Sequence, residues 1–398
     1  MTDRSVAAAD ARWMRLALEL AAHGEGLVEP NPMVGCVLVR DEQLIGQGFH
    51  ARYGGPHAEA AALADCFDAR GATAYVTLEP CCHYGKTPPC SESLVAAGVA
   101  RVVVAVEDPY PKVAGGGLRT LRRAGIDVTT GVLGDEAAEL LAPYLKRVRT
   151  GRPWVIAKWA MSMDGRIATA TGQSQWITGP LARHEVHCLR GRMDGIAVGM
   201  GTVVADDPQL TVRMESGQAV RRVPGEGGHP SPPPRVPVRL VFCRRRLPDL
   251  QSRLVQTAGE VPTWVIAGPG LAPADLARLA DHDVEIWPAD SEDAVEMVDE
   301  ALQMLASEHN AAGRPMTNLL VEGGGELLGN FAAGGHLDEV HLYLGPLVIG
   351  GRSAPGPVGD PGVQELADAS RWHLRRHESF GEDVRLVYQR SRNSSLID

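Results

Sequence analysis

The sequence has few aromatic residues, and it lacks both an excess of positive charge and a long apolar run. Aromatic residues make up 5% of the 398 residues, which argues against stacking platforms for single-stranded nucleic acid. Acidic side chains outnumber basic ones by 49 to 39, giving a formal net charge of −10. General nucleic-acid and membrane-surface binders need a cationic face, so neither nucleic acid nor membrane is expected as a partner.

No apolar stretch reaches the roughly 18 residues of a transmembrane helix. Charged residues at positions 10, 12 and 15 interrupt the first segment, which predicts an amphipathic helix burying Trp13 rather than a signal peptide. The seven cysteines are an odd number, and three of them lie between residues 81 and 90. Such a cluster favours metal binding over a disulfide framework, and we expect a cytoplasmic protein.

Strand and helix patterns alternate in two blocks, which predicts an α/β fold with mostly parallel sheets. The basic, turn-rich segment 146–153 separates the blocks, so we expect domains over residues 1–147 and 148–398. Residues 213–238 are rich in proline and predict a surface loop. The expected strands cover residues 33–40, 73–78, 101–106, 154–160, 195–199, 238–242, 263–267, 284–287, 318–322 and 339–343, with another opening at 128; helices are expected over 57–66, 91–97 and 118–124.

A set of metal ligands is the strongest chemical pattern in the first block. His57 and Glu59 are followed by Cys81, which comes after a proline, and by Cys90. One histidine and two cysteines supply the three ligands of a catalytic zinc and leave a fourth position for water. A carboxylate that is not a ligand must carry protons, and Glu59 is placed for this role.

Other interpretations of these residues stay open at this point. A fourth ligand from Cys82 or His83 would make a closed structural zinc site, and a non-catalytic zinc module could bind a partner. Taken singly, the cysteines could be small core residues, and the His-x-Glu triplet a solvated helix surface. Together the residues match the zinc nucleobase-deaminase pattern, but eight residues separate Cys81 from Cys90 where two are common.

Three segments stand out in the second block. Residues 158–166, KWAMSMDGR, end a strand and enter a loop, and residues 174–178, SQWIT, follow. Residues 321–328, VEGGGELL, run from a strand into a glycine-rich helix start, which suits a phosphate cradle or simply tight glycine packing. The spacing of the glycines is not that of a Rossmann domain.

Several of these motifs resemble the bifunctional deaminase–reductase family of riboflavin biosynthesis. They are residues 80–90, PCCHYGKTPPC, with NPMVGC at 31–36 and PHAE at 56–59, and the resemblance covers nearly the whole chain. It implies a cytidine-deaminase-like three-layer α/β/α domain, followed by a dihydrofolate-reductase-like α/β domain. The implied cofactors are Zn²⁺ and NADPH, and the substrates are phosphorylated pyrimidines.

The resemblance also assigns residues. In the first half it implies zinc ligands His57, Cys81 and Cys90, a proton-carrying Glu59, and substrate contacts from Asn31, His50, His83 and Lys86. Cys82 departs from the family, which usually has serine there.

In the second half, residues 199–213, GMGTVVADDPQLTVR, match the family's substrate and catalytic region. Lys158 and Asp206 are the candidates for proton handling, although Asp206 and Asp207 before a proline could simply form a turn. The implied substrate contacts are Ser174, Arg190, Leu210, Arg213 and Glu322. The implied NADPH contacts are Ala160, Trp176, Thr178, Thr202, Asp206, Gly324, Gly325, Glu326, Leu327, Leu328 and Gly329.

The expected function is therefore deamination of 2,5-diamino-6-(5-phosphoribosylamino)pyrimidin-4-one, then NADPH-dependent reduction of the ribosyl chain to ribityl. The alternative is a zinc deaminase of another nucleobase joined to an unrelated C-terminal domain. Because members of the family tend to associate, we expect a homo-oligomer.

Overall fold

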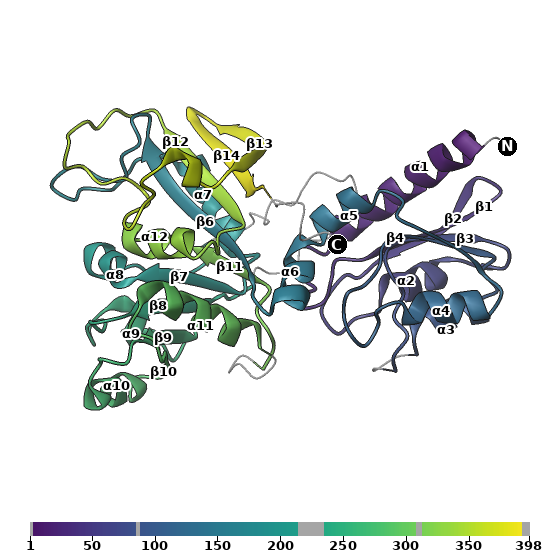
Figure 1. The fold of residues 1–398 in the computed structure, drawn as a ribbon, viewed down its shortest axis with the longest axis horizontal. Coiled ribbons are helices and arrows are strands. Elements are labelled where there is room, and N and C mark those ends of the chain that lie inside the picture. Colours follow the sequence, from purple (N-terminus) through teal and green to yellow (C-terminus); the bar gives the residue numbers. More distant parts are fainter. Residues whose placement is uncertain (1–2, 85–87, 214–234, 308–312, 392–398) are drawn as a thin grey trace. The chain divides into compact units, whose positions relative to one another are not determined.

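The computed structural model describes residues 3–84, 88–213, 235–307 and 313–391. Lys86 and most of the proline-rich segment lie outside the described residues. The chain forms two compact units that divide between Gly151 and Arg152, and each unit has its own sheet (Figure 1). In the part of the chain that the structure describes, no helix is long and apolar enough to cross a membrane.

The first unit contains a five-stranded sheet in the order β2-β1-β3-β4-β5. Its strands are β1 (Gly35–Arg40), β2 (Gln43–Phe49), β3 (Thr73–Leu78), β4 (Arg101–Val106) and β5 (Asp127–Thr130). Its helices are α1 (Asp3–Ala22), α2 (Ala58–Asp65), α3 (Cys90–Ala96), α4 (Gly116–Arg123), α5 (Gly134–Leu140) and α6 (Ala142–Thr150).

Alternate residues of β1 point to opposite faces of this sheet, and each face has its own core. Val37 and Val39 pack with Trp13 of α1 on one face. Cys36 and Leu38 pack on the other face with residues of α2, α3 and α4. The result is a three-layer α/β/α unit, as predicted, and the helix around Trp13 is confirmed.

The sheet of this unit is mixed: β3, β4 and β5 pair parallel, as predicted, whereas β1 is antiparallel to both β2 and β3. Strand β2 was missed because glycine is unfavourable in a strand pattern. Here the glycines allow β2 to pack closely against α2. A Cβ on Gly46 would lie 2.6 Å from the Ala62 carbonyl oxygen, and a Cβ on Gly48 would lie 2.5 Å from the Ala62 nitrogen. Segment 146–153 is also not a turn, since α6 continues through it to Thr150.

The second unit contains a nine-stranded sheet in the order β10-β9-β8-β7-β11-β6-β12-β14-β13. Its first seven strands are parallel, as predicted, and an antiparallel β-hairpin completes it. The hairpin was not predicted, because β13 is largely exposed and four consecutive residues of it, RRHE at 375–378, are charged or histidine. The strands are β6 (Trp154–Ser162), β7 (Gly195–Gly199), β8 (Val238–Cys243), β9 (Thr263–Ala267), β10 (Val284–Pro288), β11 (Asn318–Val321), β12 (Glu339–Gly345), β13 (Trp372–Phe380) and β14 (Asp383–Arg390).

Helices leave the carboxyl ends of β7 and β11 in opposite directions along the sheet. From β7 the chain passes through α8 to β8, whereas from β11 it passes through α12 to β12, on the far side of β6. Such a reversal opens a crevice at the carboxyl ends of the strands, where α/β sheets bind ligands. The helices of this unit are α7 (Pro180–Arg190), α8 (Met200–Asp206), α9 (Arg253–Gln256), α10 (Pro273–Ala280), α11 (Ala294–Ala306), α12 (Gly325–Ala333) and the short η1 (Leu366–Asp368).

Candidate active sites

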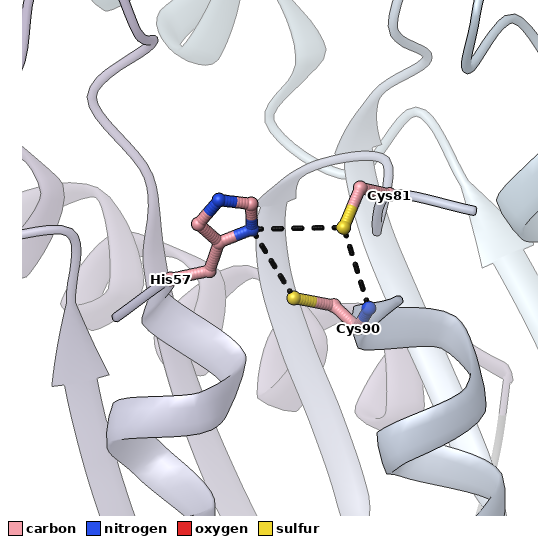
Figure 2. A group of neighbouring side chains, drawn as sticks. All are labelled: His57, Cys81 and Cys90. Carbon is pink, nitrogen blue, oxygen red and sulfur yellow. Dashed lines mark hydrogen bonds between the residues drawn. The ribbon is translucent and has the colours of Figure 1, made fainter. Parts of the chain in front are cut away.

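Three predicted metal ligands meet in the first unit (Figure 2). His57 is the N-cap residue of α2, Cys81 follows β3, and Cys90 is the first residue of α3. His57 Nδ1 lies 3.6 Å from Cys81 Sγ and 3.3 Å from Cys90 Sγ, and the three ligand atoms lie within 4.8 Å of one another. The arrangement suits one ion held by a nitrogen and two sulfurs.

The electrostatics of the cluster fit a soft divalent metal. The hydrogen bond from the Cys90 thiol, together with that of His57 and the Cys90 backbone N–H, lowers the pKa of Cys81 to about 4 against the effect of burial. A thiolate is the form that binds zinc. Neither Cys82 nor His83 belongs to the ligand group found among the described residues, and Cys82 Sγ instead lies 3.5 Å from the Lys112 carbonyl oxygen. The structure therefore favours an open three-ligand site over a closed structural one.

Glu59 is the carboxylate beside this cluster. It lies in the first turn of α2 and is 3% exposed. Burial raises its pKa, and the thiolate of Cys81 adds to the effect. A buried carboxyl that is not a metal ligand is well suited to exchange protons with a reacting group.

Asn31 and His50 form a defined hydrogen-bonded pair. His50 Nδ1 lies 2.8 Å from the Pro56 carbonyl oxygen, so this nitrogen must carry the proton. His50 Nε2 is then an acceptor, and Asn31 Nδ2 donates to it over 3.1 Å. This hydrogen bond fixes the amide of Asn31 so that its oxygen points away from His50. Both ring nitrogens of the buried His50 are hydrogen-bonded to protein atoms.

The other two predicted substrate contacts of this unit, His83 and Lys86, are not among the residues of the metal cluster. His83 is exposed, and its ring centroid lies 6.5 Å from that of Tyr110. Lys86 lies outside the described residues.

Glu79 is a buried residue that the sequence analysis missed. Its Oε2 accepts hydrogen bonds from the backbone N–H groups of Asp108 (3.2 Å) and Gly115 (3.0 Å), and its Oε1 from that of Leu118 (3.2 Å). This carboxylate ties the chain just before Cys81 to the start of α4. The glycine run at 115–117 was the available signal, because a Cβ on Gly117 would lie 1.9 Å from the Pro80 carbonyl oxygen.

Lys158, Arg190 and Glu322 come together in the second unit. Arg190 donates two hydrogen bonds of 2.6 Å to the Glu322 carboxylate. Burial opposes ionisation of Glu322, but the charge and hydrogen bonds of Arg190 outweigh it and lower its pKa to about 2. Burial lowers the pKa of Lys158, and the charge of Glu322 opposes this. The cluster therefore places a lysine whose pKa is lowered by burial beside a fixed ion pair.

His187 is a second residue that the sequence analysis missed. It lies one turn before Arg190 on α7, and its Nδ1 accepts a hydrogen bond from the Arg213 backbone N–H over 3.2 Å. Arg190 donates to the Thr211 carbonyl oxygen over 3.0 Å. Burial and the charges of Arg190 and Arg213 lower the pKa of His187 to about 4, so it is a neutral acceptor at pH 7. The last turn of α7 thus holds segment 211–213 at two points.

Asp206 lies at the end of α8, apart from the Lys158 cluster. It is exposed and accepts a hydrogen bond from the Ser174 hydroxyl over 3.3 Å. Within the described residues, no hydrogen bond or ion pair joins Asp206 to Lys158. Asp207 has φ of 38°, as expected at a turn, and Leu210 is buried with φ of 50°.

Backbone groups meet closely at the carboxyl ends of β7 and β11. The Gly199 N–H donates to the Gly323 carbonyl oxygen over 3.0 Å. The Thr202 hydroxyl lies 3.3 Å from the position that a Cβ on Gly324 would take. The space beside Gly324 is therefore narrow, which favours glycine there, and the backbone N–H groups at the start of a helix suit an anionic group.

The remaining predicted cofactor contacts come from several elements of this unit. Leu327 and Leu328 lie in the core of the sheet, and a Cβ on Gly329 would lie 2.2 Å from the Asp360 carbonyl oxygen. Tight packing therefore explains that last glycine. Ala160 lies in β6 and pairs with a residue of β12. Trp176 is 65% exposed, with the Arg183 guanidinium 4.3 Å from its ring. Thr178 lies just before α7, and Gly325 and Glu326 are the first two residues of α12.

Comparison with known families assigns both units. Residues 7–106 match the family of the cytidine and deoxycytidylate deaminase zinc-binding region. Residues 153–386 match the RibD C-terminal domain family. The folds and the ligand cluster define a two-activity enzyme, in which a zinc-dependent deaminase domain is followed by an NADPH-dependent reductase domain.

Full-length relatives identify the family. Riboflavin biosynthesis protein RibD of Escherichia coli (strain K12) is 40% identical over 94% of this chain and 98% of its own length. The RibD structure of Acinetobacter baumannii (form 1) is 37% identical, covers 97% of this chain and 100% of its own, and has a TM-score of 0.80. A deaminase/reductase structure from Thermotoga maritima is 31% identical, with 97% and 99% coverage and a TM-score of 0.75.

The chain belongs to the RibD family of bifunctional riboflavin-biosynthesis enzymes. The alternative of an unrelated C-terminal domain is not favoured, since the likeness covers both units.

Proposed function

We propose that residues 1–147 deaminate 2,5-diamino-6-(5-phosphoribosylamino)pyrimidin-4-one, and that residues 148–398 then reduce 5-amino-6-(5-phosphoribosylamino)uracil to its ribityl form. In the first reaction water replaces the 2-amino group and ammonia leaves. In the second, the ribosyl chain gains a hydride and a proton. The observation that carries the proposal is the convergence of His57, Cys81 and Cys90 next to the buried carboxyl of Glu59.

The deaminase residues take distinct roles in this proposal. His57, Cys81 and Cys90 hold zinc, which when bound supplies Lewis-acid activation of water at neutral pH. Glu59 moves a proton to the departing amino group, because its raised pKa suits it to hold that proton briefly. The Asn31 amide oxygen accepts from an N–H at the pyrimidinone edge.

His50 has a supporting role in this proposal. His50 fixes the rotation of the Asn31 amide, so we assign it a positioning role where the resemblance implied direct contact. The resemblance assigns His83 and Lys86 to the ribose phosphate.

In the reductase unit, NADPH when bound supplies the hydride. Lys158 donates the proton, since burial lowers its pKa and makes proton release easier. Arg190 and Glu322 orient the substrate, and Arg213 offers a guanidinium for its phosphate. The other assigned positions are Ser174 and Leu210 for substrate, and Ala160, Trp176, Thr178, Thr202, Asp206 and residues 324–329 for the dinucleotide.

The deaminase assignment is tested by Glu59→Gln, with the exposed Glu19→Gln as the matched control. We expect ammonia release from the diaminopyrimidine to fall about 10²- to 10⁴-fold in Glu59→Gln. Zinc content should stay unchanged, because Glu59 is not a ligand. Undiminished ammonia release, or faster release from free cytosine or transfer RNA, would contradict the proposal.

The reductase assignment is tested separately by following NADPH absorbance with the deaminated product. Lys158→Met should lower the rate about 10²-fold or more, while Lys112→Met, in the other unit, should not change it. An unmodified enzyme that oxidises no NADPH would refute the reductase half alone.

We also propose a cytoplasmic homo-oligomer. All seven cysteines are free, which fits a reducing compartment. Light scattering on the full chain and cell fractionation test the two statements.

A further inference from the structure

The end of segment 158–166 has no role in the reactions described so far. Residues 162–166 form a turn after β6, the β6 turn, in which the Ser162 N–H donates to the Arg166 carbonyl oxygen over 2.9 Å. Gly165 in this turn has φ of 79°, a conformation that favours glycine. The turn therefore has one defined backbone geometry, from which its side chains reach a second segment.

Asp164 is an exposed carboxylate of the β6 turn that is hydrogen-bonded through both oxygens. Its Oδ1 accepts from the Ser162 hydroxyl over 2.6 Å and from the Ile349 N–H over 3.0 Å, and its Oδ2 accepts from the Gly350 N–H over 2.7 Å. These hydrogen bonds lower the pKa of Asp164 to about 2. Both N–H groups belong to residues 346–371, the β12–β13 connection, which Asp164 thus binds to the turn (Figure 1).

Arg166 holds the β12–β13 connection at a second place. Its guanidinium donates to the Ala354 carbonyl oxygen over 2.7 Å. Just beyond the turn, the Ile167 N–H donates to the Pro355 carbonyl oxygen over 3.1 Å. The first part of the connection is therefore fixed to the β6 turn by both side-chain and backbone hydrogen bonds.

The next part of the β12–β13 connection packs against the start of α12. The Gly359 N–H donates to the Gly325 carbonyl oxygen over 2.9 Å. A Cβ on Gly325 would lie 3.6 Å from the Pro357 carbonyl oxygen, and a Cβ on Gly329 would lie 2.2 Å from the Asp360 carbonyl oxygen. The connection therefore lies along the first turn of α12, whose backbone N–H groups suit the anionic part of a dinucleotide.

We propose that Asp164 and Arg166 are positioning residues of the reductase, which act through residues 346–360 to hold the start of α12 in the geometry that binds the dinucleotide. This inference rests on the proposed reductase function. A long connection that is free has many conformations, and ordering it at each binding event costs free energy unless the protein orders it beforehand. If only a fraction of the molecules is competent to bind, the apparent affinity falls by that fraction.

The experiment compares the full chain with two pairs of variants. Asp164→Ala removes the three hydrogen bonds of the carboxylate, and Asp281→Ala, at the exposed C-cap position of α10, is its matched control. Arg166→Met removes the donor to the Ala354 carbonyl oxygen and keeps an unbranched side chain, whereas Arg166→Lys keeps one donor.

Three measurements are made on each protein. Calorimetry gives the affinity for NADP⁺ without turnover. Steady-state kinetics give kcat and the KM values for NADPH and for the uracil substrate. Hydrogen exchange over residues 346–360 reports whether the β12–β13 connection has been released from the β6 turn.

We expect Asp164→Ala and Arg166→Met to weaken NADP⁺ binding and to raise the KM for NADPH about 10-fold, which corresponds to a binding-competent fraction of about one tenth. The kcat and the KM for the uracil substrate should change less than about 2-fold, because the effect is on dinucleotide binding alone. Hydrogen exchange over residues 346–360 should accelerate in these two variants. Arg166→Lys and Asp281→Ala should behave like the unmodified protein.

Two results would overturn the inference and leave the reductase function standing. One is unchanged NADP⁺ affinity in Asp164→Ala and Arg166→Met, whether or not hydrogen exchange accelerates. The other is an equal loss of NADP⁺ binding, uracil-substrate binding and kcat, since that pattern indicates a general loss of structure. If Asp164→Ala does not fold, the comparison of Arg166→Met with Arg166→Lys decides the question. An unmodified protein that binds no NADP⁺ would instead refute the proposed reductase function, and this inference with it.

Discussion

Replacing Glu79 by glutamine probes how the loop that carries Cys81 is anchored. The carboxylate is 3% exposed and accepts three backbone hydrogen bonds, two at Oε2 and one at Oε1. Glutamine has nearly the same shape, but it has one acceptor oxygen and no charge. Its amide NH₂ must then face at least one backbone N–H group.

The cost can be worked from these bonds. Hydrogen bonds to a charged group contribute about 1.5–3 kcal/mol each, and neutral ones about 0.5–1.5. If the glutamine oxygen takes the Oε2 position, two bonds weaken by about 1 kcal/mol each. The orphaned Leu118 N–H adds about 1–3 kcal/mol. We therefore expect Glu79→Gln to destabilise the first unit by about 3–5 kcal/mol.

Urea titration at fixed free zinc, read as zinc release and loss of deamination, measures this change. Hydrogen exchange at the Gly115 and Leu118 amides should accelerate in parallel. Glu107→Gln, at an exposed position just after β4, is the control and should shift the midpoint little. A cost below about 1 kcal/mol for Glu79→Gln, with unchanged amide exchange, would refute the reasoning.

Three further outcomes test the other features of the two sites. Because the pKa of Glu322 is lowered from 4.5 to about 2, its pairing stabilises the second unit fully above pH 4.5. About 3 kcal/mol should be lost as the pH falls from 4.5 to 2, and acid unfolding of Glu322→Gln should lack this step. His187→Leu should raise the KM for the uracil substrate about 5- to 10-fold, whereas His187→Asn, whose amide oxygen can accept the Arg213 N–H, should not. Chelation of zinc should abolish ammonia release but leave NADPH oxidation of the deaminated product intact, and parallel loss of both would contradict two independent sites.

Buried strands were the elements best predicted from sequence. The bounds of four strands were predicted to the residue: 73–78, 101–106, 195–199 and 263–267. Short apolar stretches between turn residues are typical of strands that are buried on both faces of a parallel sheet. Strand β2 and the hairpin of β13 and β14 were missed. The glycines of β2 allow close packing against α2, and β13 is largely exposed and charged. The pattern of apolar residues within a strand does not report such contacts with neighbouring elements.

The site residues divide in the same way. By itself the sequence determined the ligand types, His57, Cys81 and Cys90, and the nearby carboxylate, since zinc chemistry demands those side chains. Only the tertiary structure decided that ligands 24 and 33 residues apart share one point, or that Arg190 meets Glu322 across 132 residues. Separation along the chain says nothing of distance in space until strand order and direction are set, and these follow from packing of the whole sheet.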